Sequence, residues 1–264
     1  MEMVVAKDTK VEKTLQLEEG QQLHVILESG AHLELLLNVM GGHVATEVQV
    51  GKGATFDLCN LDENSANDTR IHDLTIRQDA DSHVFVQNIS LAAGNTNITT
   101  RVDLCGEGAE LHLNGLVVAS GSQQIDNHTL VQHMVPHTTS HQLFKYVLDE
   151  KAVGTYAGLV KVMEGAHHTV SEQTNRNLCA TREARMLAQP QLEIYNDDVR
   201  CNHGSSTGQL DESALFYMQQ RGIYKHEARL LLMAAFMSEV VNQVRIPALR
   251  ERLQEMVEKR FRNL

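Results

Sequence analysis

Four short segments of this 264-residue chain share one pattern and recur at almost regular intervals. Each begins with small or turn-forming residues and continues with alternating polar and apolar residues: "GAHLELLL" from Gly30, "GATFDLC" from Gly53, "DSHVFVQ" from Asp81 and "GAELHLNG" from Gly108. "GAHHTV" from Gly165 resembles a later copy. Repeats of such similar length are typical of solenoids, in which each coil buries the apolar face of its neighbour.

The residues around these repeats are typical of strands rather than helices. Apolar side chains alternate with polar ones in runs bounded by Gly, Asn and Asp, as at 32–39, 82–91, 100–105, 109–118 and 143–148. No long helical stripe precedes residue 170. The sequence therefore predicts a mainly β protein in which residues 1–208 form a parallel β-helix. A β-sandwich is the alternative, because it also combines short strands with regular turns.

Residues 209–264 change to helical periodicity. Asp211 suits an N-cap, Gly222 suits a helix stop, and Pro247 suits the first position of a last helix. The longest predicted helix carries an apolar stripe of Leu230, Met233, Met237, Val240 and Val244. Helices this few enclose little core of their own. We expect them to cover the end of the solenoid, a second copy of the chain or another protein.

Composition excludes several classes of protein. The chain has 23 Lys and Arg against 34 Asp and Glu, a net charge of −11, which argues against nucleic-acid binding. No run approaches the ~20 apolar residues of a membrane span, and the first residues do not resemble a signal peptide. The four cysteines are scattered without a C-x-x-C pair, which favours a reducing compartment. We therefore expect a cytoplasmic protein with no nucleic-acid or membrane partner.

Motifs of common enzymes are absent, but histidine is abundant, at 14 residues. No G-x-S-x-G, Walker loop, G-x-G-x-x-G or H-E-x-x-H occurs. His133, His137 and His141 would share one face of a strand and so form a weak candidate metal site. His83, His112 and His141 are evenly spaced by about one coil, and stacking on successive coils is their expected arrangement.

Cys201 and His203 form a stronger candidate. Positions two apart on a strand point the same way, so the thiolate and the imidazole would offer two ligands together. Such a pair suits iron or zinc, but it needs further donors from another chain or coil to complete a site. A thiolate activated by an imidazolium is the catalytic alternative. A buried cysteine beside a hydrogen-bonded histidine is the structural one.

The segment "PQLEIYNDDVRCNHGSSTGQLDESALFYMQQRGI", residues 190–223, resembles the C-terminal signature of the SufB/SufD family. The matching residues are Pro190, Leu192, Glu193, Ile194, Asp197, Asp198, Val199, Cys201, His203, Gly204, Gly208, Asp211, Glu212, Leu215, Phe216, Tyr217, Arg221, Gly222 and Ile223. "EARLLLMAAFMSEVV" continues the match to residue 241. SufB relatives usually have His-Glu-Ala at this point, so His203-Gly204 indicates the SufD side of the family.

This resemblance implies a right-handed β-helix flanked by helices, and a non-enzymatic scaffold subunit for iron–sulfur cluster assembly. It implies pairing with a SufB-like paralogue and docking of the SufC ATPase by the C-terminal helices. A transient iron–sulfur cluster at the subunit interface is implied near His203 and Cys201, with no cofactor held tightly by this chain alone. The residues expected to contact a partner are Leu215, Phe216, Tyr217, Leu230, Phe236 and Glu239.

The chain departs from the family pattern in two respects. Ser205-Ser206-Thr207 replaces the usual Ala-Thr-x, and the first strand is expected near residue 1, where typical relatives have a long N-terminal helical region. A homodimer is therefore an alternative to pairing with a SufB-like chain. Two other functions stay open. One is a stand-alone histidine-rich metal-binding protein, and the other is a carbohydrate-active enzyme with carboxylates clustered on one face of the solenoid.

Overall fold

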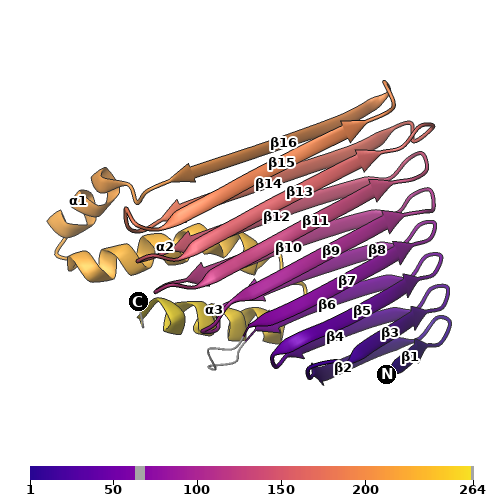
Figure 1. The fold of residues 1–264 in the computed structure, drawn as a ribbon, viewed down its shortest axis with the longest axis horizontal. Helices are drawn as coiled ribbons and strands as arrows, with labels where there is room; N and C mark the ends of the chain where they lie inside the picture. Colours follow the sequence, from indigo (N-terminus) through magenta and orange to yellow (C-terminus); the bar gives the residue numbers. More distant parts are fainter. Residues whose placement is uncertain (63–68, 263–264) are drawn as a thin grey trace.

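The chain folds into a parallel β-helix built from two sheets (Figure 1). The computed structural model describes residues 1–62 and 69–262, and every strand pair within them is parallel. Odd-numbered strands form one sheet of eight strands and even-numbered strands form the other, so the chain alternates between the sheets as it coils. The predicted β-helix is confirmed, and the β-sandwich is excluded.

The strands follow one another in chain order along the solenoid, with β1 at one end and β16 at the other. The odd-numbered sheet contains β1 (Glu2–Val5), β3 (Gln22–Leu27), β5 (Gly42–Val50), β7 (Arg70–Gln78), β9 (Thr96–Leu104), β11 (Gln124–His133), β13 (Val153–Val162) and β15 (Arg185–Ile194). The even-numbered sheet contains β2 (Lys10–Leu17), β4 (His32–Val39), β6 (Thr55–Asp62), β8 (His83–Ser90), β10 (Glu110–Ala119), β12 (Thr139–Leu148), β14 (Thr169–Cys179) and β16 (Val199–Gly208).

The repeat starts mark a turn in which one residue per coil has a left-handed backbone. φ is +70° at Gly30, +66° at Gly53, +56° at Asp81 and +75° at Gly108, where the chain passes from the odd-numbered to the even-numbered sheet. The turns also bond from coil to coil, since the Gly30 amide donates to the Lys52 carbonyl at 2.9 Å. A left-handed residue favours glycine or a short polar side chain, which is why this position is visible in the sequence.

Two later coils have histidine at the same turn position. His137 and His168 both have a φ of +56°, and they stack on each other with ring centroids 4.8 Å apart. The copy that starts at Gly165 is therefore misaligned, because the equivalent residue is His168. The coil that starts at His137 has no small residue at its turn, and so the pattern did not reveal it.

Alternation along each strand directs one set of side chains into the space between the sheets. In β4, Leu33, Leu35 and Leu37 are fully buried in this interior. The same inward positions in β14 carry Ser171 and Gln173, which are also buried but polar. These two rows of inward positions therefore change from apolar near the N-terminal end to polar near the C-terminal end.

Three helices follow the last strand, as the sequence predicts. They are α1 (Glu212–Gln220), α2 (Lys225–Asn242) and α3 (Pro247–Arg262). Asp211 caps α1 by accepting a hydrogen bond from the Ser213 amide at 2.8 Å, and Gly222 follows the helix with a φ of +87°. Among the described residues, no helix has both the length and the apolar character needed to cross a bilayer.

The helices α2 and α3 cover the flank of the solenoid and leave its end open (Figure 1). Met237, Val240 and Phe261 are buried in a cluster with Leu116 and Val147, which lie on the outer side of the even-numbered sheet. The sheet is apolar on both sides there, so the helices dock on it. The expectation that helices cover the end of the solenoid is wrong, because apolar side chains on this outer face decide where they pack.

A buried lysine fixes α2 to the sheet. The side chain of Lys145, in β12, is 4% exposed, and its Nζ lies 2.8 Å from the Phe236 carbonyl oxygen and 2.5 Å from Glu239 Oε2. Arg176 also pairs with Glu239, at 3.3 Å. The ammonium group of Lys145 beside Glu239 lowers the pKa of that carboxyl. Glu239 therefore already serves a structural contact within the chain.

Two buried histidines make the fold sensitive to acid. Burial lowers the pKa of His72 and of His133 to about 4, so both rings are neutral in the folded protein at neutral pH. In the unfolded chain a histidine titrates near 6.5, so unfolding takes up protons between pH 6.5 and about 4. We expect the free energy of unfolding to fall across this window by up to roughly 3 kcal/mol per histidine, and to be insensitive to these groups above it.

Urea unfolding of the wild type and of His133→Gln at pH 7.5, 6 and 5 measures this effect. The variant loses a ring that stays neutral in the folded state down to about pH 4, so its stability should decrease less than that of the wild type as the pH falls. A difference between the two proteins that stays constant with pH would contradict the prediction.

Candidate functional site

The C-terminal end of the solenoid is an open edge. β15 and β16 are the last strands of their sheets, so each pairs with a strand on one side only among the described residues. Every residue of β16 is partly or fully exposed. An exposed edge presents unpaired main-chain N–H and C=O groups, which readily pair with another chain. We call the face formed by β15 and β16 the end face.

Cys201 and His203 both lie on the inward side of β16, as their spacing predicts. Cys201 is in register with Ser171 of β14, and His203 is in register with Gln173. Since Ser171 and Gln173 face the interior, the two predicted ligands point into the last coil rather than away from the solenoid. Cys201 is half-buried and His203 is exposed. The strand therefore presents a thiol and an imidazole side by side at the open end.

The described residues raise the pKa of the Cys201 thiol and so do not activate it. Burial raises its pKa, and a backbone hydrogen bond with Ser171 opposes that effect only in part. A cysteine with a raised pKa is protonated at neutral pH and is a poor nucleophile. It becomes a thiolate when a metal or a neighbouring positive charge displaces the proton. This argues against the catalytic alternative, whereas metal ligation and a purely structural role both stay open.

A chain of hydrogen bonds runs through the interior below Cys201. Ser171 Oγ and Ser140 Oγ are 2.8 Å apart, and His133 Nε2 lies 2.9 Å from Ser140 Oγ. The other ring nitrogen of His133 lies 2.7 Å from Thr138 Oγ1. The polar interior therefore reaches from the middle of the solenoid to the residue paired with Cys201.

The three histidines expected on one strand face do not share one. His133 ends β11 in the interior, where it is hydrogen-bonded to Ser140 and Thr138. His137 lies in the turn, and His141 lies on the outer side of β12. The candidate metal site at these residues is wrong, because the chain turns from one sheet to the other between His133 and His141.

The expected histidine stack is confirmed for two of its three members. His112 and His141 are in register on β10 and β12, and their rings are stacked with centroids 5.2 Å apart. His83 is in register with Glu110 instead, and its Nδ1 lies 3.0 Å from that carboxylate. A constant coil length misplaces His83, because the coil from β8 to β10 is shorter than the coil from β10 to β12.

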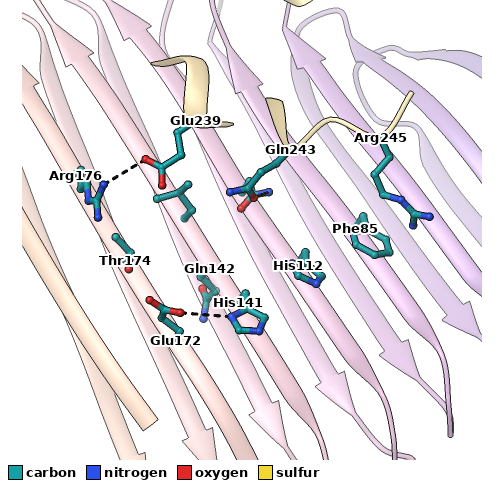
Figure 2. A pocket seen from close by; sticks show the side chains of 12 residues that line it. Phe85, His112, His141, Gln142, Glu172, Thr174, Arg176, Glu239, Gln243 and Arg245 are labelled. Carbon is teal, nitrogen blue, oxygen red and sulfur yellow. Dashed lines mark hydrogen bonds and ion pairs between the residues drawn. The ribbon is translucent and has the colours of Figure 1, made fainter. Parts of the chain in front are cut away.

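A groove beside α2 contains this stack (Figure 2). It has a volume of about 470 Å³ and lies on the outer side of the even-numbered sheet. Phe85 continues the stack, with its ring 4.9 Å from His112, and the Arg245 guanidinium lies 4.0 Å from the Phe85 centroid. His141 Nδ1 is 3.7 Å from Glu172 Oε2. The contact of Arg245 with Phe85 joins the loop between α2 and α3 to the sheet.

One group of metal-ligand residues occurs among the described residues. His32, Glu34 and Asp57 place one ligand atom each within 4.8 Å of one another. Two cations already neutralise the carboxylates, since Lys10 Nζ lies 2.6 Å from Glu34 and Arg245 Nη1 lies 3.3 Å from Asp57. Burial raises the pKa of Asp57. The group is therefore an ion-pair network, which weakens both the metal-binding and the carbohydrate-active alternatives.

The six expected partner-contact residues fall into two groups. Phe216 and Tyr217 of α1 are 63% and 59% exposed. Leu215 is buried, and the remaining residues, Leu230, Phe236 and Glu239, pack against or pair with the sheet or its cluster.

Two further exposed apolar residues are not among the partner contacts expected from the sequence. Tyr224 is 79% exposed and Leu231 is 52% exposed, just after α1 and within α2. Leu231 is apolar but lies outside the buried stripe of α2, and the sequence alone contains this signal. Together with Phe216 and Tyr217 they form an exposed apolar set, which we call the α1–α2 surface.

Comparison with known proteins gives a family match over most of the chain. Residues 9–236 match the family model described as "SUF system FeS cluster assembly, SufBD core domain". An iron–sulfur cluster assembly SufBD family protein of Synechocystis is 29% identical over 215 residues, covering 81% of this chain and 48% of the relative.

Two SufD proteins give similar matches. The iron–sulfur cluster assembly protein SufD of Escherichia coli is 31% identical over 192 residues, which is 72% of this chain and 44% of the relative. SufD of Bacillus subtilis is 30% identical over 169 residues, which is 64% of this chain and 39% of the relative. The chain thus spans about half the length of these relatives or less. With the β-helix and the matched core model, these similarities show that the chain belongs to the SufBD core family and lies close to SufD.

Proposed function

We propose that this chain is a scaffold subunit for iron–sulfur cluster assembly, and that its end face pairs with a partner and contributes ligands to the nascent cluster. The observation that carries this proposal is the open edge of β16, which presents Cys201 and His203 beside unpaired main-chain groups. A SufB-like paralogue would pair with that edge and bring further ligands. The SufD and SufBD relatives, whose names state iron–sulfur cluster assembly, support this role.

The chemistry of the two donors fits a transient cargo. A thiolate and an imidazole both bind iron, but two donors do not complete a four-coordinate site. Ligands divided between two chains would hold a nascent cluster while the chains are together and release it when they move. The part of this chain is to offer His203 and Cys201 at the boundary, without catalysing a reaction of its own.

The α1–α2 surface is the proposed docking site for a SufC-like ATPase. Phe216, Tyr217, Tyr224 and Leu231 are exposed apolar or aromatic side chains, and aromatic residues are frequent among those that dominate binding at interfaces. We keep Phe216 and Tyr217 as contact residues. The other expected contact residues would hold α1 and α2 in place, because they already make contacts within the chain. They are Leu215, Leu230, Phe236 and Glu239.

A homodimer that pairs two end faces is the competing assembly. It would place two Cys201–His203 pairs together and supply four donors from identical chains. None of the four cysteines, all of which lie in the described residues, forms a disulfide. The cytoplasmic location expected from their spacing stays a prediction.

His203→Ala should leave the fold intact and lower cluster yield by about tenfold or more. The side chain is exposed on an edge strand, so its loss removes a donor and little packing. The measurement is anaerobic cluster reconstitution on the chain co-purified with SufB-like and SufC-like proteins, read by absorbance and by iron and sulfide content. Asn202→Ala, on the outward side of the same strand, is the matched control. Equal yields from wild type and His203→Ala would refute the proposed role.

Phe216→Asp combined with Tyr217→Asp should weaken binding of the SufC-like ATPase by at least about tenfold, because charges replace apolar contacts at an interface. Binding is measured by titration of the purified ATPase into this chain. Val4→Asp is the control, since Val4 is also exposed, at 55%, but lies at the opposite end of the solenoid. The docking site lies elsewhere if the double variant binds as tightly as the wild type.

A further inference from the structure

Gln173 lies directly below His203 in the interior of the last coils. It is on the inward side of β14, in register with His203 on one side and with Gln142 of β12 on the other. Gln173 is completely buried, whereas His203 is exposed at the open edge. Neighbouring strands are ~4.8 Å apart, so the long side chain of glutamine reaches the imidazole of the adjacent position.

The amide of Gln173 lacks a well-formed hydrogen bond. Neither its nitrogen nor its oxygen has a contact of hydrogen-bond geometry, although both atoms are buried. A buried amide without well-formed hydrogen bonds destabilises a fold, and most buried polar groups are therefore paired. The apolar residues at the same inward positions in β4 show that this solenoid can fill its interior without such a group.

The opposite sheet makes room for this amide. A Cβ on Gly158 of β13 would collide with Gln173 Nε2 and would lie 2.6 Å from the hydroxyl of Tyr156. Burial raises the pKa of Tyr156, and the nearby Gln173 side chain opposes that effect, as an amide N–H directed at the hydroxyl oxygen would. The nitrogen of the amide is thus directed toward Gly158 and Tyr156. Gln173 Oε1 is then the acceptor that remains for His203, which lies in register on β16.

His203 is the donor that can meet this acceptor. Its side chain makes no hydrogen bond or ion pair with any part of the chain that the structure describes. Because the ring is exposed on an edge strand, little packing fixes its orientation. We propose that Gln173 positions His203: Gln173 Oε1 accepts a hydrogen bond from one ring N–H and turns the other ring nitrogen toward the end face.

This inference rests on the proposed function of His203 and extends it to a positioning residue. A histidine that binds a metal usually donates its other ring N–H to an acceptor, which fixes both the tautomer and the orientation of the ring. Loss of such an acceptor typically lowers metal affinity or activity by about 10- to 100-fold. The buried amide of Gln173 would then be kept for function although it does not stabilise the fold.

The test compares Gln173→Met with the matched control Gln142→Met. Methionine keeps the length of glutamine and removes its oxygen acceptor. Gln142 occupies the same inward row one strand farther from His203, and its Oε1 accepts a hydrogen bond from Thr129 at 3.1 Å. The tautomer of His203 is read from the ring ¹⁵N shifts of the histidine-labelled chain, assigned with His203→Ala. Cluster yield and unfolding temperature are measured on the same proteins.

We expect one dominant tautomer of His203 in the wild type and in Gln142→Met, and a mixture in Gln173→Met. Cluster yield should fall about tenfold in Gln173→Met alone. Its unfolding temperature should be unchanged or higher, because a poorly paired amide is removed, while that of Gln142→Met should fall. A purely structural role for Gln173 would instead lower stability and leave the ring shifts unchanged.

Ring shifts of His203 that are identical in Gln173→Met and the wild type would overturn the inference, whatever happens to the cluster. If His203→Ala keeps full cluster yield, the proposed function fails instead. In that case the ring shifts still decide whether Gln173 holds His203.

Discussion

Main-chain hydrogen bonding from coil to coil is the interaction on which the rest of the structure depends. Each strand within the solenoid pairs with the strand one coil before and one coil after it, in parallel register. Any strand of such a stack can pair with one more strand, so the last strands present unpaired main-chain groups unless something covers them. In this chain α2 and α3 could have covered that end. They pack on the flank instead, because the outer side of the even-numbered sheet is apolar around Leu116 and Val147.

Two rows of inward positions on the even-numbered sheet change from apolar to polar in the same direction along the solenoid. Leu33, Leu35 and Leu37 fill the early coil, whereas Ser171 and Gln173 occupy the corresponding side near the end face. Buried polar groups stabilise a fold less than apolar packing does, and those without partners destabilise it. Sites that violate the rules of packing are often functional. The polar inward positions and the open edge of β16 lie at the same end of the molecule, which is therefore the part that we expect to be functional.

Much of the fold could be predicted from the sequence, because local signals and global structure agree in the first coils. The left-handed turn residues Gly30, Gly53, Asp81 and Gly108 set the repeat, and leucines alternate strictly in β4. The prediction weakened where those signals are absent. Later turns use His137 and His168, and the inward residues of β14 are polar, so alternation no longer reveals which side faces the core.

The candidate site divides in the same way. The spacing of Cys201 and His203 was sufficient to predict a shared side of a strand, because that depends only on a period of two residues. The position of Gln173 below His203 was not predictable, since it depends on the register between strands of different coils. The apolar stripe of α2 was predictable from its spacing, but the surface that it covers was not, because that surface, around Leu116 and Val147, belongs to strands far away in the sequence.

We propose that the end face is the surface where this chain meets a SufB-like partner. Hydrogen–deuterium exchange of β16 amides, with and without a SufB-like protein, tests it most directly. We predict that the β16 amides directed away from β14 exchange rapidly in the chain alone and become protected in the complex, while β1 at the other end is unchanged. Protection of β1 or of the helices without protection of β16 would contradict the claim.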